Sequence, residues 1–173
     1  PVTGYNIVKR CHFHHSGTVK TNGMAVQVHL SGDNRIEGNH IHHMPYGGIS
    51  IAGTRLDYWK PKLAPDIDKP YTAAKVRPVV PTEGNVIAGN TIHHVMQELG
   101  DGGAIYLWGL SGTKPNVVRD NRIEDVGRGD ELAVGLYMDD QMHDVRVRDN
   151  LVVRANWGAH LHGCSGCVFE MVP

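Results

Sequence analysis

The chain has 173 residues, of which 40% are hydrophobic, and a net charge of −1 at pH 7 with its histidines neutral. This length predicts a single domain, and the near-zero charge gives no electrostatic reason to expect nucleic-acid binding. The sequence contains no run of 18 apolar residues, so we expect no membrane-spanning segment. The chain starts at Pro1 and lacks a signal peptide, so we expect a mature, trimmed or partial chain.

One short motif recurs five times without a gap, in residues 10–16, 38–44, 89–95, 120–126 and 149–155. Its second position is Cys11 in the first copy and then Asn39, Asn90, Asn121 and Asn150. The steps between these positions are 28, 51, 31 and 29 residues, so one step contains an insertion of about 22 residues. A repeat of about 29 residues predicts a solenoid.

Four copies of the motif follow an apolar, β-rich run, and all five are followed by a second run that alternates with a period of two. The runs before it are residues 5–8, 85–87, 116–118 and 145–147, and those after it are 24–29, 48–52, 104–108, 135–139 and 158–162. Three short strands per repeat predict an all-β fold, a right-handed parallel β-helix of about five coils. We expect the four Asn side chains to stack at an inward corner.

Residues 1–173 are expected to form one β-helix domain, with residues 54–83 as an insertion between the second and third coils. This insertion is Pro-rich, and we expect any helix to lie in it or at the chain ends. Both ends of a five-coil solenoid would be open sheet edges, which natural proteins cover. We therefore expect flanking coils or other domains of a longer chain.

The second strand of each coil predicts two outward-facing columns, because alternate residues of a strand point to opposite sides. The columns read Gln27, Ser50, Tyr106, Tyr137, His160 and His29, Ala52, Trp108, Asp139, His162. Aromatic rings beside an acid suit a sugar, whose C–H faces stack and whose hydroxyls need partners. The alternative is an aromatic ladder that only stabilises the sheet surface.

Two sequence pieces extend this interpretation: Gly-Asp-Gly-Gly-Ala-Ile-Tyr at residues 100–106 and Gly-Leu-Tyr-Met-Asp-Asp at 135–140. With the repeats, they resemble the right-handed parallel β-helix proteins of bacterial carbohydrate breakdown. They are most similar to the glycoside hydrolase family that holds α-fucosidases and xylanases (family 141). The resemblance implies two catalytic aspartates, here Asp101 and either Asp139 or Asp140. It also implies a secreted or periplasmic protein whose partner is an oligo- or polysaccharide.

Other residues join these aspartates in the predicted site. The candidate sugar-binding residues are Tyr106, Trp108, Tyr137, His160, His162, Trp59 and Glu98. Asp101 precedes its strand, whereas Asp139 ends the matching strand one coil later. The loop before Gly103 must therefore fold back to bring them together, or Asp101 would pair better with Asp130.

Twelve histidines raise the question of a metal site. His14, His42, His93 and His15, His43, His94 form two ladders, and consecutive residues of an extended segment face opposite ways. We therefore interpret these residues as structural or surface ladders. His160, His162, Cys164 and Cys167 leave zinc, a disulfide and free cysteines open, and free cysteines are expected. We expect no metal and no cofactor.

Three functions remain open at this point. The leading one is a glycoside hydrolase that acts with paired aspartates. A polysaccharide lyase or epimerase is the second, although the outward columns hold no Lys or Arg to neutralise a uronate. The third is a structural or glycan-binding β-helix segment without catalysis.

Overall fold

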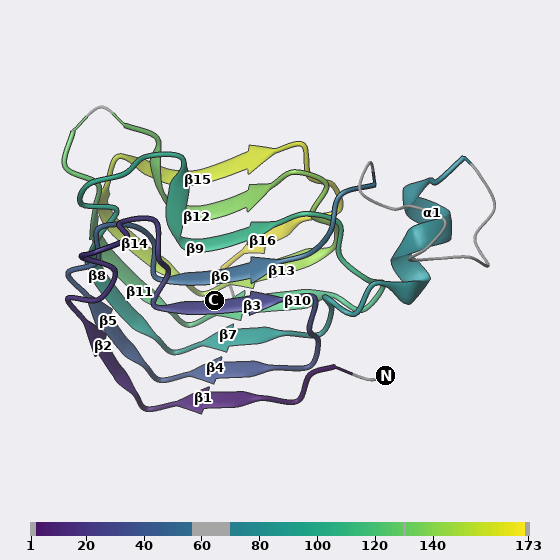
Figure 1. Cartoon of the computed structure of the whole chain (residues 1–173), viewed down its shortest axis with the longest axis horizontal. Helices are drawn as coiled ribbons and strands as arrows, with labels where there is room; N and C mark the ends of the chain where they lie inside the picture. Colours follow the sequence, from purple (N-terminus) through teal and green to yellow (C-terminus); the bar gives the residue numbers. More distant parts are fainter. Residues whose placement is uncertain (1–2, 57–69, 130, 172–173) are drawn as a thin grey trace.

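The computed structural model describes residues 3–56, 70–129 and 131–171, whose strands form three parallel sheets wound as stacked coils (Figure 1). The first sheet holds β1 (Ile7–Lys9), β4 (Arg35–Glu37), β7 (Val86–Ala88), β10 (Asn116–Arg119), β13 (Val145–Arg148) and β16 (Val168–Glu170). The second holds β2 (His12–His14), β5 (His40–His42), β8 (Thr91–Val95), β11 (Arg122–Val126) and β14 (Leu151–Ala155). The third holds β3 (Val26–His29), β6 (Ile49–Ala52), β9 (Gly102–Trp108), β12 (Ala133–Asp139) and β15 (Trp157–His162).

The chain visits the three sheets in turn, so each successive trio of strands makes one coil. The predicted all-β parallel β-helix of about five coils is confirmed, and β16 adds a sixth strand to the first sheet. None of the described helices is long and apolar enough to cross a membrane.

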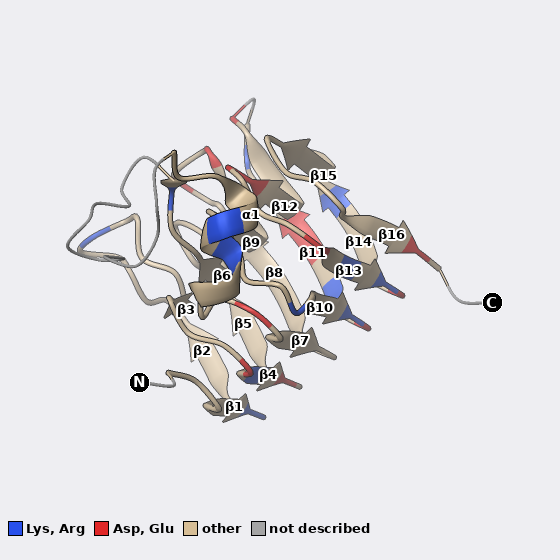
Figure 2. Cartoon of the chain, turned by 90° about the vertical axis from the view of Figure 1, so that its right-hand side faces the viewer, with Lys and Arg blue, Asp and Glu red and all other residues tan. Residues whose placement is uncertain are grey.

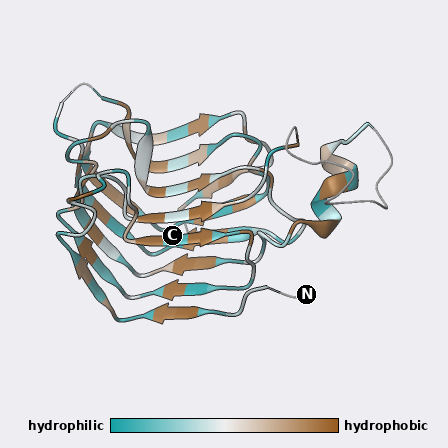
Figure 3. Ribbon diagram, viewed as in Figure 1, coloured by the Kyte–Doolittle hydropathy of each residue, from teal (hydrophilic) through white to brown (hydrophobic). Residues whose placement is uncertain are grey.

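Inward-facing side chains of the three sheets form one continuous hydrophobic core, and the strands of Figure 3 accordingly carry brown segments. In the third sheet Ile49, Ile105 and Leu136 are stacked in register and buried, as the period-two pattern predicts. Leu161 belongs to the neighbouring inward column but is 54% exposed, because β15 is the last strand of its sheet.

The predicted asparagine ladder is present at the corner between the first and second sheets. Asn39 donates to Asn90 Oδ1, Asn90 to Asn121 and Asn121 to Asn150, at 2.9, 2.9 and 2.8 Å. Each acceptor oxygen also receives the backbone N–H of the Asn in the coil before. One side chain per coil therefore satisfies a buried backbone donor as well as an amide.

A second asparagine ladder, which we did not predict, joins Asn6, Asn34, Asn85 and Asn116. Its side-chain amides bond at 2.8, 2.7 and 2.9 Å, again with the backbone N–H groups sharing the acceptors. Each of these residues stands five positions before the Asn or Cys of the first ladder. That fixed offset was the signal in the sequence, and the ladder stops where Val145 replaces Asn in the fifth coil.

Left-handed backbone marks the corners of the coils. The residue before the first ladder has φ between 53° and 62° in all five coils, and Gly or Asp fills this position in four of them. These residue types tolerate that conformation best. A second such column holds His15, His43 and His94, with φ near 50°.

The second column overturns one premise of the sequence interpretation. Consecutive histidines do not face opposite ways, because the left-handed second residue breaks the alternation of the strand. The Nδ1 atoms of His14–His15, His42–His43 and His93–His94 lie 3.0, 2.7 and 2.9 Å apart. The predicted stacking along the two histidine columns is confirmed, with ring centroids 4.8–5.3 Å apart.

The insertion leaves the solenoid after β6 and carries the described helices, α1 (Ala73–Val76) and η2 (Arg77–Val79), as predicted. In Figures 1 and 2, α1 stands beside the coils. Val76 and Val80 pack with Leu110 in a small separate core. Arg77 donates to the carbonyl of Gly112 and pairs with Asp144. The described part of the insertion is therefore fixed to the third and fourth coils.

Replacing Asn90 with Ala should lower the free energy of unfolding by about 2–4 kcal/mol. The change removes two acceptor contacts to Asn39 and leaves the buried Ile36 carbonyl without this donor, and each unsatisfied group costs about 1–3 kcal/mol. Thr91→Ala, an exposed change one residue away, should stay within about 0.5 kcal/mol. Urea unfolding measures the free energy of unfolding of both variants. An equal loss of stability in the two would contradict the stabilising role of the asparagine ladder.

Candidate active site

The strand register of the third sheet confirms the two predicted columns. Gln27, Ser50, Tyr106, Tyr137 and His160 are aligned, as are His29, Ala52, Trp108, Asp139 and His162. β12 ends in a carboxylate between the uncharged ends of β9 and β15, which Figure 2 shows as a red tip. A single acid therefore interrupts a face of rings and small side chains.

The columns are less open than the sequence predicts. Tyr137 is only 2% exposed, because its ring is stacked between Tyr106 at 4.8 Å and His160 at 4.9 Å. Ser50 and Ala52 are also buried. The columns are aligned as predicted, but in the middle coils neighbouring rings cover one another, so side chains there are buried although they lie on the outer face.

Asp139 is held at both carboxylate oxygens and is 8% exposed. The Tyr106 hydroxyl donates to Oδ2 at 2.7 Å, and His162 Nδ1 lies 2.6 Å from Oδ1. Burial, followed by this hydrogen bond to Asp139, raises the pKa of Tyr106. A neutral His162 ring that donates to Asp139 through Nδ1–H carries its free lone pair on Nε2.

Asp101 lies on a left-handed turn, with φ of 54°, at the start of β9. The Tyr46 hydroxyl donates to its backbone carbonyl at 2.7 Å. A Cβ on Gly102 would stand 2.7 Å from the Tyr46 ring, so the first Gly of the Asp-Gly-Gly motif makes room for this tyrosine. Tyr46, which the sequence interpretation missed, thus fixes the turn that carries Asp101.

The two aspartates act on the same pair of tyrosines. Burial is the main cause that raises the pKa of Tyr137 to about 12, and the charges of Asp139 and then Asp101 add to it. The pKa of Tyr46 is raised by burial, then by Asp101 and Asp139. The carboxylates of Asp101 and Asp139 are therefore both within electrostatic reach of Tyr46 and Tyr137, despite their different positions along the strands.

A pocket of about 240 Å³ opens beside Tyr106 on the first three coils. Its walls are Asn22, Met24, Gln27, Tyr46, Ser50, Arg55, Tyr106 and Trp108. Among the described residues, Ser50 Oγ is one of two buried side-chain polar atoms without a hydrogen-bond partner. A buried hydroxyl of this kind on a pocket wall can hydrogen-bond with a polar group of a ligand.

Arg55, from the insertion, occupies space that the sequence interpretation left for a sugar. Its guanidinium carbon lies 5.7 Å from the centroid of the Trp108 ring, and Nε pairs with Asp140. Asp140 is thus held by Arg55 at the end of β12. Ala52, 0% exposed, leaves no open space above Trp108, so the ring is approached from the side of Arg55 and the pocket.

The remaining candidates lie elsewhere. Glu98 is exposed and lines a different pocket, together with His43, His94 and Pro45. His160 stacks between Tyr137 and the half-exposed Trp157, and its Nδ1 is the other buried polar atom without a partner in the described chain. Trp59 and Asp130 lie outside the described residues.

The zinc and disulfide alternatives near the C-terminus are not supported. Cys11, Cys164 and Cys167 are free cysteines. Burial and the neighbouring Cys167 raise the pKa of the Cys164 thiol to about 11. His162 turns to Asp139, and within the described ranges the group of side chains close enough to share an ion is His12, His40 and His42.

Comparison with known proteins adds one structural likeness. No protein-family profile matches the chain, and no curated protein matches it. A solved structure described as a glycoside hydrolase is similar, with a TM-score of 0.67, 21% sequence identity and coverage of 98% of this chain. The chain spans 25% of the length of that structure. At this identity the likeness shows a shared fold.

Gly102→Ala should destabilise the protein by about 1–3 kcal/mol, because the added methyl group overlaps the Tyr46 ring and one of the two must shift. Gly158→Ala is the matched control in β15, since nothing lies within 4 Å of its Cβ position. Thermal unfolding of both variants compares them. A Gly102 variant as stable as the Gly158 variant would show that Tyr46 does not pack on the turn.

Proposed function

We propose that the chain forms part of the catalytic β-helix of a glycoside hydrolase that acts on an oligo- or polysaccharide. The observation that carries the proposal is the fixed carboxylate of Asp139, held by Tyr106 and His162 on an aromatic face. The solved glycoside hydrolase with the same fold supports a carbohydrate-related role. In this proposal the protein works outside the cytoplasm of a bacterium, where such polymers are met.

Glycoside hydrolysis needs one carboxyl group as acid and a second as nucleophile or base. We assign the second role to Asp139, because two partners hold its oxygens in place. We assign the acid role to Asp101, which is exposed on its turn and shares Tyr46 and Tyr137 as electrostatic neighbours with Asp139. The pocket beside Tyr106 would bind a sugar ring next to this pair.

The substrate class follows from the sequence motifs. Residues 100–106 and 135–140 resemble the family of α-fucosidases and xylanases, so fucosides and xylan are the first substrates to test. Ser50 Oγ, Gln27 and Asn22 offer hydroxyl and amide groups on the pocket wall for sugar hydroxyls.

Asp139→Asn should reduce sugar release by about 100-fold or more, the usual scale for loss of a catalytic carboxyl group. The Asn keeps the shape but turns an NH₂ group toward His162 or Tyr106, so unfolding measurements should show a loss of about 1–2 kcal/mol. Asp120→Asn, an exposed carboxylate at a corner of the second sheet, is the control and should keep full activity. A folded Asp139 variant with wild-type turnover would exclude Asp139 and favour Asp140.

Trp108→Ala should weaken substrate binding by about 1–3 kcal/mol, the usual scale for an aromatic anchor. Arg55 would lose the ring beneath it, so we also expect a small fall in melting temperature. Phe169→Ala, in the first sheet, is the matched loss of a partly exposed aromatic ring. Calorimetric titration with oligosaccharides measures the effect. A large loss of stability with unchanged affinity would instead show that Trp108 serves only to seat Arg55.

One observation favours a polysaccharide lyase as the second candidate. Arg55 supplies a guanidinium on the pocket wall, although the two columns themselves hold no Lys or Arg. A lyase needs such a cation beside the uronate carboxylate, and His162 or a tyrosine as base. The products separate the two reactions, because a lyase leaves an unsaturated sugar that absorbs ultraviolet light and a hydrolase leaves a saturated one. Glycan binding without any product would favour a binding segment.

A further inference from the structure

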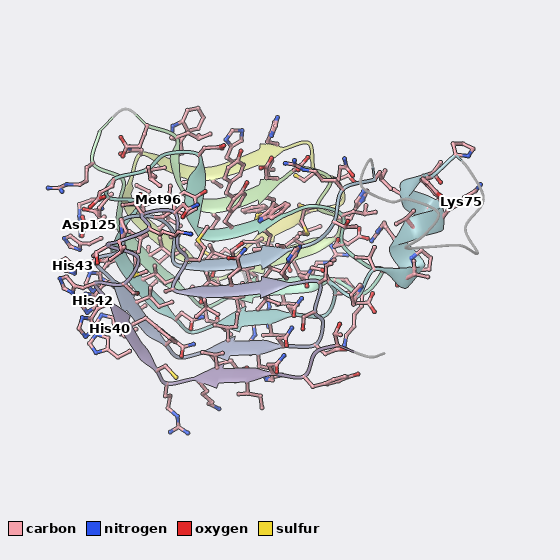
Figure 4. The ribbon with its side chains drawn as sticks, viewed as in Figure 1. His40, His42, His43, Lys75, Met96 and Asp125 are labelled. Carbon is pink, nitrogen blue, oxygen red and sulfur yellow. The ribbon has the colours of Figure 1, made fainter. Side chains whose placement is uncertain are left out.

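Histidines gather on the outer face of the second sheet, whereas the candidate active site lies on the third sheet. His12 is opposite His40 in the register between β2 and β5. His42 follows two residues after His40 on the same face, because Ile41 between them points into the core and is fully buried. Figure 4 shows His40 and His42 projecting outward from the same edge of the coils.

The ring nitrogens of these three histidines lie close together. One ring nitrogen from each of His12, His40 and His42 lies within 4.8 Å of the other two. His12 Nε2 and His42 Nε2 are 2.7 Å apart, and the centroids of the three rings are 4.7–4.9 Å apart. Two imidazole nitrogens bound to one tetrahedral zinc ion stand about 3.3 Å apart, given Zn–N bonds of about 2.0–2.1 Å. The His12 and His40 rings are stacked with planes 4° apart, so binding requires these rings to turn about their broad χ2 torsions until both lone pairs point at the ion.

We propose that His12, His40 and His42 bind one divalent transition-metal ion of the zinc, nickel or copper type. Imidazole suits these ions, and three histidines with an open fourth position form a common zinc ligand set. The ligands come from two neighbouring hydrogen-bonded strands, so the sheet fixes their spacing before the ion binds. The site would be independent of the proposed hydrolase activity.

The ring of His42 has the second contact that metal-binding histidines usually have. Its Nδ1 lies 2.7 Å from His43 Nδ1, which the left-handed backbone of His43 turns back toward it. When Nε2 binds the metal, the ring proton moves to Nδ1 and is donated to His43. His43 is therefore a positioning residue.

The sequence limits the site to the first two coils. In the column of His12 and His40, the third coil has Thr91, the fourth Arg122 and the fifth Leu151. In the column of His42, the fourth coil has Glu124. His93 remains as a neighbour, with its Nε2 2.9 Å from His40 Nε2. One ion per chain is therefore the expected stoichiometry.

Calorimetric titration of the whole chain with Zn²⁺, and separately with Ni²⁺, tests the proposal. We expect one equivalent to bind with a low micromolar or lower dissociation constant, and to raise the melting temperature by mass action. His42→Ala should weaken binding by about 100-fold or more, and His43→Ala by about 10-fold or more, as outer partners of metal ligands do. His29→Ala removes an exposed histidine of the third sheet. It should change neither the dissociation constant of the metal nor the rise in melting temperature that the metal causes.

The variants change exposed or half-exposed rings, and their unfolding curves without metal check that they fold. Binding that needs several equivalents and falls equally in all histidine variants would overturn the proposal, because it would reveal scattered surface histidines. Unchanged affinity in the His12→Ala, His40→Ala and His42→Ala variants would also overturn it. Visible absorption of the Co²⁺-loaded chain gives an independent readout, since the bands of a tetrahedral ion should disappear with His42.

Discussion

The stacking of coil on coil through asparagine amides is the constraint on which the rest of the structure depends. A left-handed corner turns the chain from the first sheet into the second, and it leaves a backbone N–H pointing along the solenoid axis. The Asn Oδ1 of the next coil accepts that N–H together with an amide hydrogen. The register of one coil is thereby locked to the next, and every column on the outer faces inherits this register.

The asparagine hydrogen bonds join successive coils even where a long insertion separates them in the sequence. Asn39 and Asn90 are 51 residues apart but bond at 2.9 Å, the same distance as Asn90 and Asn121, which are 31 residues apart. The insertion can thus vary in length without disturbing the coils, since longer loops add little closure entropy. It brings Arg55 to Asp140, 85 residues later, and so adds beside the third sheet a guanidinium, whereas the strands of that sheet contain no Arg or Lys.

The sequence predicted the parts of this fold that depend on the 29-residue repeat and on the alternation of residues within each strand. Five aligned motifs fix the number of coils, and alternation fixes which residues share a column. The sequence could not predict exposure: Tyr137 is outward by period but buried, because the rings of Tyr106 and His160 close over it. Tyr46 reaches Asp101 across 55 residues, a contact that depends on the path of two loops. The orientation of His43 was also not predictable, because its backbone is left-handed and a pattern of polar and apolar residues does not reveal that conformation.

A solenoid gives each residue type a copy of itself as neighbour, and this repetition decides where chemistry can arise. Asparagine gains from such a neighbour, because an amide both donates and accepts. Stacked groups that carry the same charge do not gain, since like charges about 5 Å apart oppose each other. Asp139 stands alone between Trp108 and His162 in its column, and the column of His12 and His40 gives way to Thr91 after two coils. The unbroken columns build the scaffold, and the broken ones are where a carboxylate or a group of imidazoles is free to meet a ligand.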